Sequence, residues 1–313
     1  MSIATLNRRL KVNTDTWRIT LRTHQSIFPL ILIAGILFIP LVTQAEILSE
    51  ATLGIKIPLT KKPTSRPMTV AYTPNPACYY IADGGLAPMA SEFEAPVSKS
   101  MVHAFTSDGK YLNSAKPGYD NRSLYYNPHN AKLETITYNI SSAAGFSPNT
   151  GIYTLDTSET GEIKDSSGEV MQFNPAFGDA GTMPSYDPGA RLYYAKQKRS
   201  NKVWIVDPKQ REKVGEISLE LDKAGVAFDD ITDNFVAFTG VKGQELAALD
   251  VDHKAVLIFD LGGKFIGKCA LPQDLKLRAH NHYNGTGYAN SMLFVYHENE
   301  GEFGTYHGYR IFK

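Results

Sequence analysis

Two histidines near the carboxyl end, His280 and His282, are the residues of this chain whose types and spacing could do chemistry. At positions i and i+2 of a strand, both imidazole rings point to one face. Such a pair can ligate a metal ion, or one ring can act as a general acid or base. We therefore predict that His280, Asn281 and His282 line a ligand site. A divalent metal is the candidate cofactor, with His280 and His282 as its candidate ligands.

A catalytic interpretation of the pair needs a carboxylate, and Asp229 is the candidate. A lyase or hydrolase could use His280 or His282 as the base, with Asp229 on a nearby loop. The competing interpretation is that both histidines are hydrogen-bonded packing residues, because no third metal ligand stands at a recognisable spacing.

Other candidate residues fit plain structural roles. His297 and His307 lie in Tyr-His-Glu-Asn-Glu-Gly and Thr-Tyr-His-Gly, which are typical of exposed strand ends and turns, so we assign them no role. Aspartates recur in similar register and could suggest a ring of carboxylates, but aspartate at the start of a tight turn hydrogen-bonds its own backbone. The aspartates concerned are Asp120, Asp187, Asp229 and Asp230.

The charge balance and the missing motifs argue against several classes of protein. The 32 basic residues balance the 32 acidic ones, which argues against a nucleic-acid binder. The chain has no Gly-x-Ser-x-Gly elbow, His-Glu-x-x-His, P-loop or Gly-x-Gly-x-x-Gly motif. The partner classes that stay open are a small molecule, a glycan or another protein.

The amino-terminal segment, residues 1–45, is typical of a secretory signal. Five basic residues and one acidic residue precede an apolar run at 27–42, and Thr43-Gln44-Ala45 follows. We predict cleavage after Ala45; the alternative is an uncleaved membrane anchor, although a bilayer-spanning helix needs about 20 apolar residues. Both interpretations place residues 46–313 outside the cytoplasm, as a secreted or periplasmic domain or as one anchored to the membrane.

The chain has two cysteines, Cys78 and Cys269. In an oxidising compartment they could form one disulfide. Two separate buried thiols fit the sequence equally well, because nothing in a sequence fixes the distance between them.

The elements that must position the candidate residues are β-hairpins. Residues 256–267 form an apolar strand ending in Asp260, a Gly262-Gly263 turn and a second strand after Lys264. Comparable hairpins occur at residues 102–111, 152–163 and 203–214. The last apolar residues before the turns recur at intervals of 50, 51 and 53 residues, and a further 53 residues lead to Phe312. These residues are Phe105, Leu155, Val206 and Phe259.

A second element recurs between the hairpins. It consists of an aromatic residue, a turn and an aromatic-rich strand. Its copies begin at Tyr72, Tyr119, Tyr186, Phe228 and Tyr283. Two hairpins per copy give four strands, and four-stranded units repeated every 40 to 50 residues or so are typical of a β-propeller. We predict an all-β chain with a propeller over residues 67–313, of five blades, with six as the alternative.

The last predicted strand, residues 309–313, has no hairpin mate after it. An unpaired strand edge is an aggregation hazard. We expect residues 53–59, in the lead-in at 46–66, to pair with it and to close the ring by joining the two ends of the chain.

Part of this repeat is similar to a known family. Residues 187–195, Asp-Pro-Gly-Ala-Arg-Leu-Tyr-Tyr-Ala, followed by Val-Trp-Ile-Val-Asp at 203–207, resemble the YVTN-type and NHL-type repeats of bacterial propellers. In those repeats an inner strand turns at Asp-Pro-x-Gly into a strand of Leu-Tyr-Val character. The resemblance covers residues 67–313 and implies a bacterial extracytoplasmic β-propeller, although the other copies lack the Pro-Gly pair or carry Asn in its place.

Propeller ligands usually lie where the inner strands and their loops meet the central channel. Just before the inner aromatic residue, four predicted blades offer small residues and the fifth offers His280 and His282. We therefore predict a ligand-binding or protein-interaction module that acts through channel-mouth loops. The alternative is a propeller enzyme, a lactonase-like hydrolase or a polysaccharide lyase or hydrolase, with a histidine-containing site at the channel.

Overall fold

Short strands, paired mostly antiparallel, are the main regular structure of the described residues, joined by turns and one helical turn. The computed structural model describes residues 45–61, 67–83, 100–117, 121–137, 151–172, 177–179, 181–277 and 285–313. The predicted site residues His280, Asn281 and His282 lie outside these ranges, as do residues 1–44. Within the described residues, no helix is long and apolar enough to cross a membrane.

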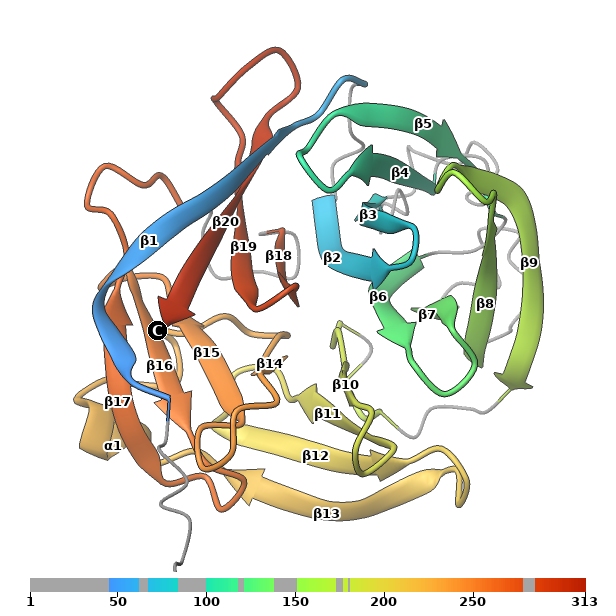
Figure 1. The fold of residues 1–313 in the computed structure, drawn as a ribbon. Coiled ribbons are helices and arrows are strands. Elements are labelled where there is room, and N and C mark those ends of the chain that lie inside the picture. The colour runs from blue at the N-terminus through green and yellow to red at the C-terminus, as the bar shows by residue number, and fades with distance from the viewer. Residues whose placement is uncertain are drawn as a thin grey trace, which may run out of the picture. The chain divides into compact units, whose positions relative to one another are not determined.

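The strands form five four-stranded blades (Figure 1). The first blade consists of β2 (Pro67–Pro74), β3 (Ala77–Asp83), β4 (Met101–Thr106) and β5 (Tyr111–Ala115). The second consists of β6 (Asn121–Asn127), β7 (Lys132–Thr137), β8 (Gly151–Thr157) and β9 (Ile163–Gln172). The third consists of β10 (Ser185–Asp187), β11 (Leu192–Lys196), β12 (Lys202–Asp207) and β13 (Glu212–Ser218).

The fourth and fifth blades follow the helical turn α1 (Leu221–Ala224). The fourth consists of β14 (Ala237–Phe238), β15 (Leu246–Asp250), β16 (Ala255–Phe259) and β17 (Phe265–Ala270). The fifth consists of β18 (Thr286–Ala289), β19 (Met292–His297), β20 (Thr305–Phe312) and the amino-terminal strand β1 (Ile47–Pro58). Its outer strand therefore comes from the opposite end of the chain.

The inner strands of the blades contact one another in a closed cycle. β2 contacts β6 and β18, β10 contacts β6 and β14, and β14 contacts β18. The predicted all-β propeller is confirmed, with five blades. The residues that set the predicted period all lie on third strands, and Phe105, Leu155, Val206 and Phe259 are at most 1% exposed in the core between blades.

The ring is closed as predicted, by a strand from the amino-terminal lead-in. β1 pairs antiparallel with β20, where Leu53 lies opposite Tyr309 and Lys56 lies opposite His307. β1 also pairs in parallel with β17, at Glu50 and Ala270, so it joins blades four and five into one eight-stranded sheet. Both closing strands are longer than predicted, because β1 begins at Ile47 and β20 begins at Thr305.

Two of the predicted inner hairpins are wrong. In the copy assigned to Tyr119, the described residues 121–126 lie in one continuous strand, β6, and the turn comes after Asn127. The copy assigned to Phe228 is a turn with an exposed phenylalanine, and the inner strand of blade four is β14. Gly225 ends α1 with a positive φ of 75°, and the Asp230 carboxylate accepts the Ala227 N–H at 2.6 Å. These local bonds fold the segment as a turn.

The aspartates at the hairpin turns cap their own backbone, as expected. One oxygen of Asp187 accepts the N–H groups of Gly189 and Ala190, at 2.8 and 3.1 Å. Asp260 does the same for Gly262 and Lys264, at 2.8 and 2.9 Å. Among the described residues, these carboxylates therefore serve turns rather than a ring around the axis.

The disulfide considered between the two cysteines is not formed. Cys78 in β3 and Cys269 in β17 are free thiols, both buried. They belong to blades one and four, and each packs as a small apolar side chain in the core. Two separate thiols, the alternative that the sequence left open, describe the structure.

Candidate functional site

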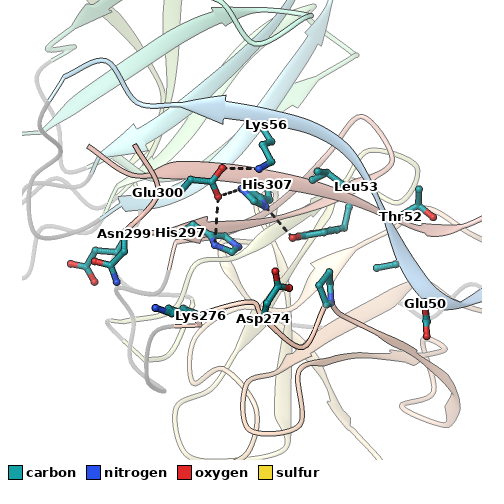
Figure 2. A pocket seen from close by; sticks show the side chains of 14 residues that line it. Glu50, Thr52, Leu53, Lys56, Asp274, Lys276, His297, Asn299, Glu300 and His307 are labelled. Atoms are coloured by element: carbon teal, nitrogen blue, oxygen red, sulfur yellow. Dashed lines mark hydrogen bonds and ion pairs between the residues drawn. The ribbon is translucent and has the colours of Figure 1, made fainter. Parts of the chain in front are cut away.

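A pocket of about 660 Å³ lies between blade five and the segment that follows β17 (Figure 2). β1 forms one wall, with Glu50, Thr52, Leu53 and Lys56, and residues 272–276 form another. The turn between β19 and β20 and the ends of both strands supply the rest. The pocket therefore lies beside the outer seam where β1 closes the ring, and not at the inner strands.

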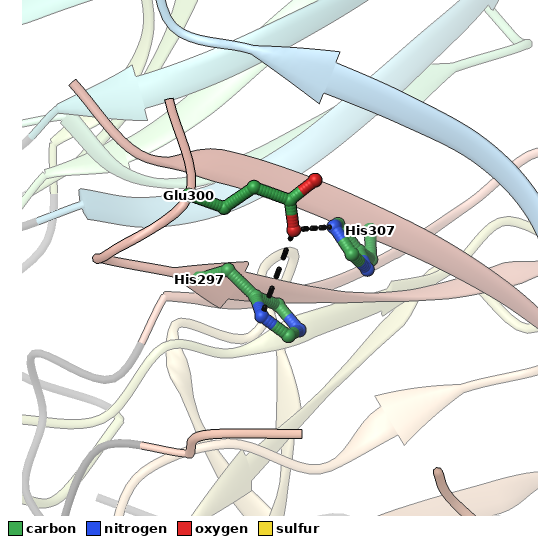
Figure 3. Close-up of side chains that lie close together, drawn as sticks. All are labelled: His297, Glu300 and His307. Carbon is green, nitrogen blue, oxygen red and sulfur yellow. Dashed lines mark ion pairs between the residues drawn. The ribbon is translucent and has the colours of Figure 1, made fainter. Parts of the chain in front are cut away.

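The register of blade five brings two histidines to this pocket. Val295 lies opposite His307 and His297 lies opposite Thr305, so His297 and His307 are diagonal neighbours on one face of the sheet. Lys56 lies opposite His307 on the other side, in β1. Glu300 belongs to the turn between β19 and β20, and its side chain reaches toward both rings (Figure 3).

One carboxylate, that of Glu300, holds the cluster together. Its Oε2 lies 2.6 Å from His307 Nε2 and 4.0 Å from His297 Nδ1, and its Oε1 accepts from Lys56 Nζ at 2.7 Å. The two imidazole rings are stacked, with centroids 4.0 Å apart and 18° between their planes. The hydroxyl of Tyr309 lies 3.0 Å from His307 Nδ1.

The electrostatic setting favours neutral imidazoles beside an ionised carboxylate. Burial lowers the pKa of His297, and the neighbouring His307 lowers it further. Burial also lowers the pKa of His307, while Glu300 acts in the opposite direction. The hydrogen bond from Lys56 lowers the pKa of Glu300. Burial raises the pKa of Tyr309 to about 12, so this residue keeps its hydroxyl proton at neutral pH.

The Tyr309 hydroxyl can accommodate either neutral form of His307, because a hydroxyl both donates and accepts. Glu300 Oε2 lies 2.6 Å from Nε2, so Nε2 carries the proton in this arrangement and Nδ1 accepts from Tyr309. The Nε2 lone pair becomes free when the proton moves to Nδ1, where Tyr309 accepts it, and Glu300 turns away. The Nε2 atoms of His297 and His307 are both buried, and Glu300 Oε2 is the polar atom that lies against His307 Nε2. The cluster can therefore offer lone pairs to a cation or exchange a proton with a ligand.

A much smaller cavity, of about 60 Å³, lies among the described inner-strand residues of all five blades. It is lined mainly by apolar and aromatic side chains, including Val70, Tyr125, Phe235 and Tyr288. The channel-mouth prediction for His280, Asn281 and His282 falls outside the described residues. Asp229 is exposed in the turn after α1 and lines neither this cavity nor the pocket, so the structure does not bring it to a described histidine site.

The expectation that His297 and His307 are exposed is wrong for both, since their side chains are only 14% and 7% exposed. His297 does end β19, whereas His307 lies inside β20. The sequence carried one usable signal, since Thr305, His307, Tyr309 and Ile311 alternate along one strand and Ile311 is fully buried. The approach of Glu300 and Lys56 had no such signal, because it depends on a turn and on a strand about 250 residues away.

Comparisons with known proteins support no closer assignment. No protein-family model matches the sequence, and no curated protein does. Glutaminyl cyclase from Myxococcus xanthus aligns with a TM-score of 0.47 and 9% identity, over 84% of this chain and 97% of its own. A gluconolactonase from Xanthomonas campestris gives 0.43 and 10%, over 87% and 99%. A luciferin-regenerating enzyme gives 0.42 and 9%, over 82% and 95%.

These scores lie below 0.5, so the functions of those proteins carry no argument for this one. Strand order and the cycle of inner-strand contacts decide the fold independently. The chain is an all-β protein with the fold of a five-bladed β-propeller.

Proposed function

We propose that this protein is an extracytoplasmic propeller that binds a hydroxyl-rich small molecule, such as a glycan, in the pocket beside β1. The pocket itself carries the proposal. Its volume of about 660 Å³ lies within the usual range of small-molecule sites, roughly 300–1,000 Å³. The cavity among the inner-strand residues, at about 60 Å³, is too small for such a ligand.

The lining suits a ligand with many hydroxyl groups, each of which donates and accepts. Exposed donors and acceptors stand around the pocket on Thr52, Asp274, Lys276 and Asn299. Leu53, beside them, adds apolar surface for the carbon face of a sugar ring. This mixture of polar and apolar groups on a rigid sheet favours a binding module.

The location outside the cytoplasm is part of the same proposal. It is supported by the basic flank, the apolar run and the small residues up to Ala45. The repeat at residues 187–207 supports a place among bacterial propellers of YVTN or NHL type.

An enzyme that uses the same pocket is the second candidate. The observation in its favour is the pair of buried ring nitrogens on His297 and His307 beside the ionised Glu300. A histidine of this kind can act as a general base in a hydrolase or a lyase. The candidate is tested by screening wild type and His307→Gln on lactones and polysaccharides; an activity that His307→Gln leaves unchanged rules it out.

The binding proposal is tested with neutral mono- and oligosaccharides, by calorimetry on the purified full chain. Thr52 is exposed at the pocket wall, so Thr52→Trp narrows the pocket without touching the histidines. We expect saturable binding by wild type and its loss in Thr52→Trp. The matched control is His280→Ala/His282→Ala, which alters the predicted channel-mouth site. Binding that is lost only in this control places the site at the channel.

A further inference from the structure

We propose that His297, Glu300 and His307 bind a divalent transition-metal ion of the zinc class. This inference deepens the proposed function, because the three residues line the same pocket. Their ligand atoms all lie within 4.8 Å of one another. Figure 3 shows the two rings and the carboxylate facing a common space.

The two distances from the carboxylate to the rings bracket the value for one small ion, and the ring nitrogens, within 4.8 Å of each other, would draw together by a turn of the stacked rings. A tetrahedral zinc ion about 2.0–2.1 Å from nitrogen and oxygen donors holds those donors about 3.3 Å apart. Glu300 Oε2 now lies 2.6 Å from His307 Nε2 and 4.0 Å from His297 Nδ1. The required separation falls between these two values. Glu300 lies on a turn and is 37% exposed, so its side chain can shift from one ring toward the other.

The donor types select the class of ion. Two imidazoles and one carboxylate suit zinc, cobalt, nickel or iron, whereas calcium and magnesium prefer an all-oxygen set of six or more ligands.

Neighbouring side chains already hold two of the ligands in place. The Tyr309 hydroxyl lies 3.0 Å from His307 Nδ1, so it can accept the Nδ1 proton and leave the Nε2 lone pair for the ion. Lys56 binds Glu300 Oε1 at 2.7 Å, which leaves Oε2 free to coordinate. The Lys56 side chain is 48% exposed, so solvent screens its charge from the ion.

Three protein ligands leave a coordination position for water or for a ligand, as in catalytic zinc sites. Here that position faces the pocket lined by Thr52 and Asp274. A hydroxyl-rich molecule in the pocket could coordinate the ion directly, which links metal binding to the proposed function. A bound water would instead be activated for hydrolysis.

Titration of chelator-treated full-length protein with zinc chloride tests the inference. Calorimetry should give one site per chain, and cobalt should give the visible absorption of a four- or five-coordinate ion. We expect His297→Ala and His307→Gln to weaken binding by about 100-fold, and Glu300→Gln by at least about 10-fold. His307→Gln keeps a side chain that can bond Tyr309, and His297→Ala alters a residue near the surface, so the two variants check each other for folding.

Two control variants separate this site from other histidines. His253 is 57% exposed and pairs with Asp250 in the β15–β16 turn, so His253→Ala should bind zinc as wild type does. His280→Ala/His282→Ala should also leave zinc binding unchanged. The inference is overturned if wild type binds no zinc, if His297→Ala/His307→Gln retains wild-type affinity, or if only His280→Ala/His282→Ala loses it.

The outcome is independent of the pocket proposal. Saccharide binding by chelator-treated protein, without zinc binding, would overturn the metal site and leave the pocket proposal standing. If wild type binds no saccharide but zinc binding persists in Thr52→Trp, the pocket proposal is overturned and the metal site stands.

Discussion

Lys56 of β1 and His307 of β20 lie opposite each other across the seam that closes the propeller, and both contact Glu300. Lys56 Nζ is 2.7 Å from one carboxylate oxygen, and His307 Nε2 is 2.6 Å from the other. The candidate site therefore exists only when the first strand of the domain has docked on the last. Ring closure and assembly of the site are one structural event.

Docking of β1 depends on its buried face, and we predict that Ile57→Asp destabilises the propeller by about 3–5 kcal/mol. Ile57 is fully buried opposite Tyr306, so the substitution places an unpaired carboxylate in the core. Leu53 on the same strand is 44% exposed, and Leu53→Asp should cost about 1 kcal/mol or less. Urea unfolding followed by tryptophan fluorescence measures both. Equal losses in the two variants would mean that burial does not decide the pairing of β1.

The turn of the β16–β17 hairpin gives a second prediction, concerning Gly263. This residue has a φ of +84°, and a Cβ there would collide with the carbonyl oxygen of Ser218. Gly263→Ala should therefore cost about 2 kcal/mol or more. Gly262 in the same turn has no positive φ, and its Cβ would lie 3.1 Å from Asp260 Oδ1, so Gly262→Ala should cost about 1 kcal/mol or less. Thermal unfolding of the two variants should separate them clearly.

The repeat was readable from sequence because strand-and-turn chemistry is local. An Asp and a Gly spaced like Asp260 and Gly263 indicate a tight turn. Phe259, just before this turn, is buried in the core like Phe105 and Val206 in their own blades. The nearly equal spacing of these turns along the chain then gives the number of blades. The closing role of residues 53–59 also followed, since the count left one strand edge without a partner.

The sequence pattern could not predict segments whose conformation is decided by competing local hydrogen bonds. Phe228 matched the inner pattern, but the carboxylate of Asp230 and the left-handed Gly225 held the segment in a turn. The site was missed for a different reason. His307 and Lys56 are neighbours only because the chain ends meet, and a sequence gives no register between strands so far apart.

The buried cysteines give a third prediction. Burial raises the pKa of Cys269 to about 11 and raises that of Cys78, so little thiolate exists at pH 8. Native protein should react slowly with a thiol reagent such as dithionitrobenzoate, and protein unfolded in guanidinium should release two equivalents at once. Export into an oxidising compartment should not change this result, because the thiols lie in different blades. Fewer than two equivalents after unfolding without reductant would contradict the free-thiol structure.

The buried Lys196, at the end of β11, gives a prediction about pH. Its side chain is fully buried, and its Nζ donates to the carbonyls of Gln197 and Ser200 at 2.9 and 2.6 Å. Burial lowers the pKa of Lys196 to about 8, against the opposing charges of Asp233 and Asp179. Between pH 8 and 10.5 the folded state therefore binds fewer protons than the unfolded state, so the contribution of Lys196 to stability rises with pH.

The rise should amount to about 3 kcal/mol across this window, since one pKa unit corresponds to about 1.4 kcal/mol. It is measured as the difference in unfolding free energy between wild type and Lys196→Met at successive pH values, which cancels the titration of the tyrosines. The matched control is Lys198→Met, two residues along and exposed, for which the difference should stay constant. A constant difference for Lys196→Met as well would mean that the buried ammonium keeps its ordinary pKa. The two carbonyl bonds would then offset its burial completely.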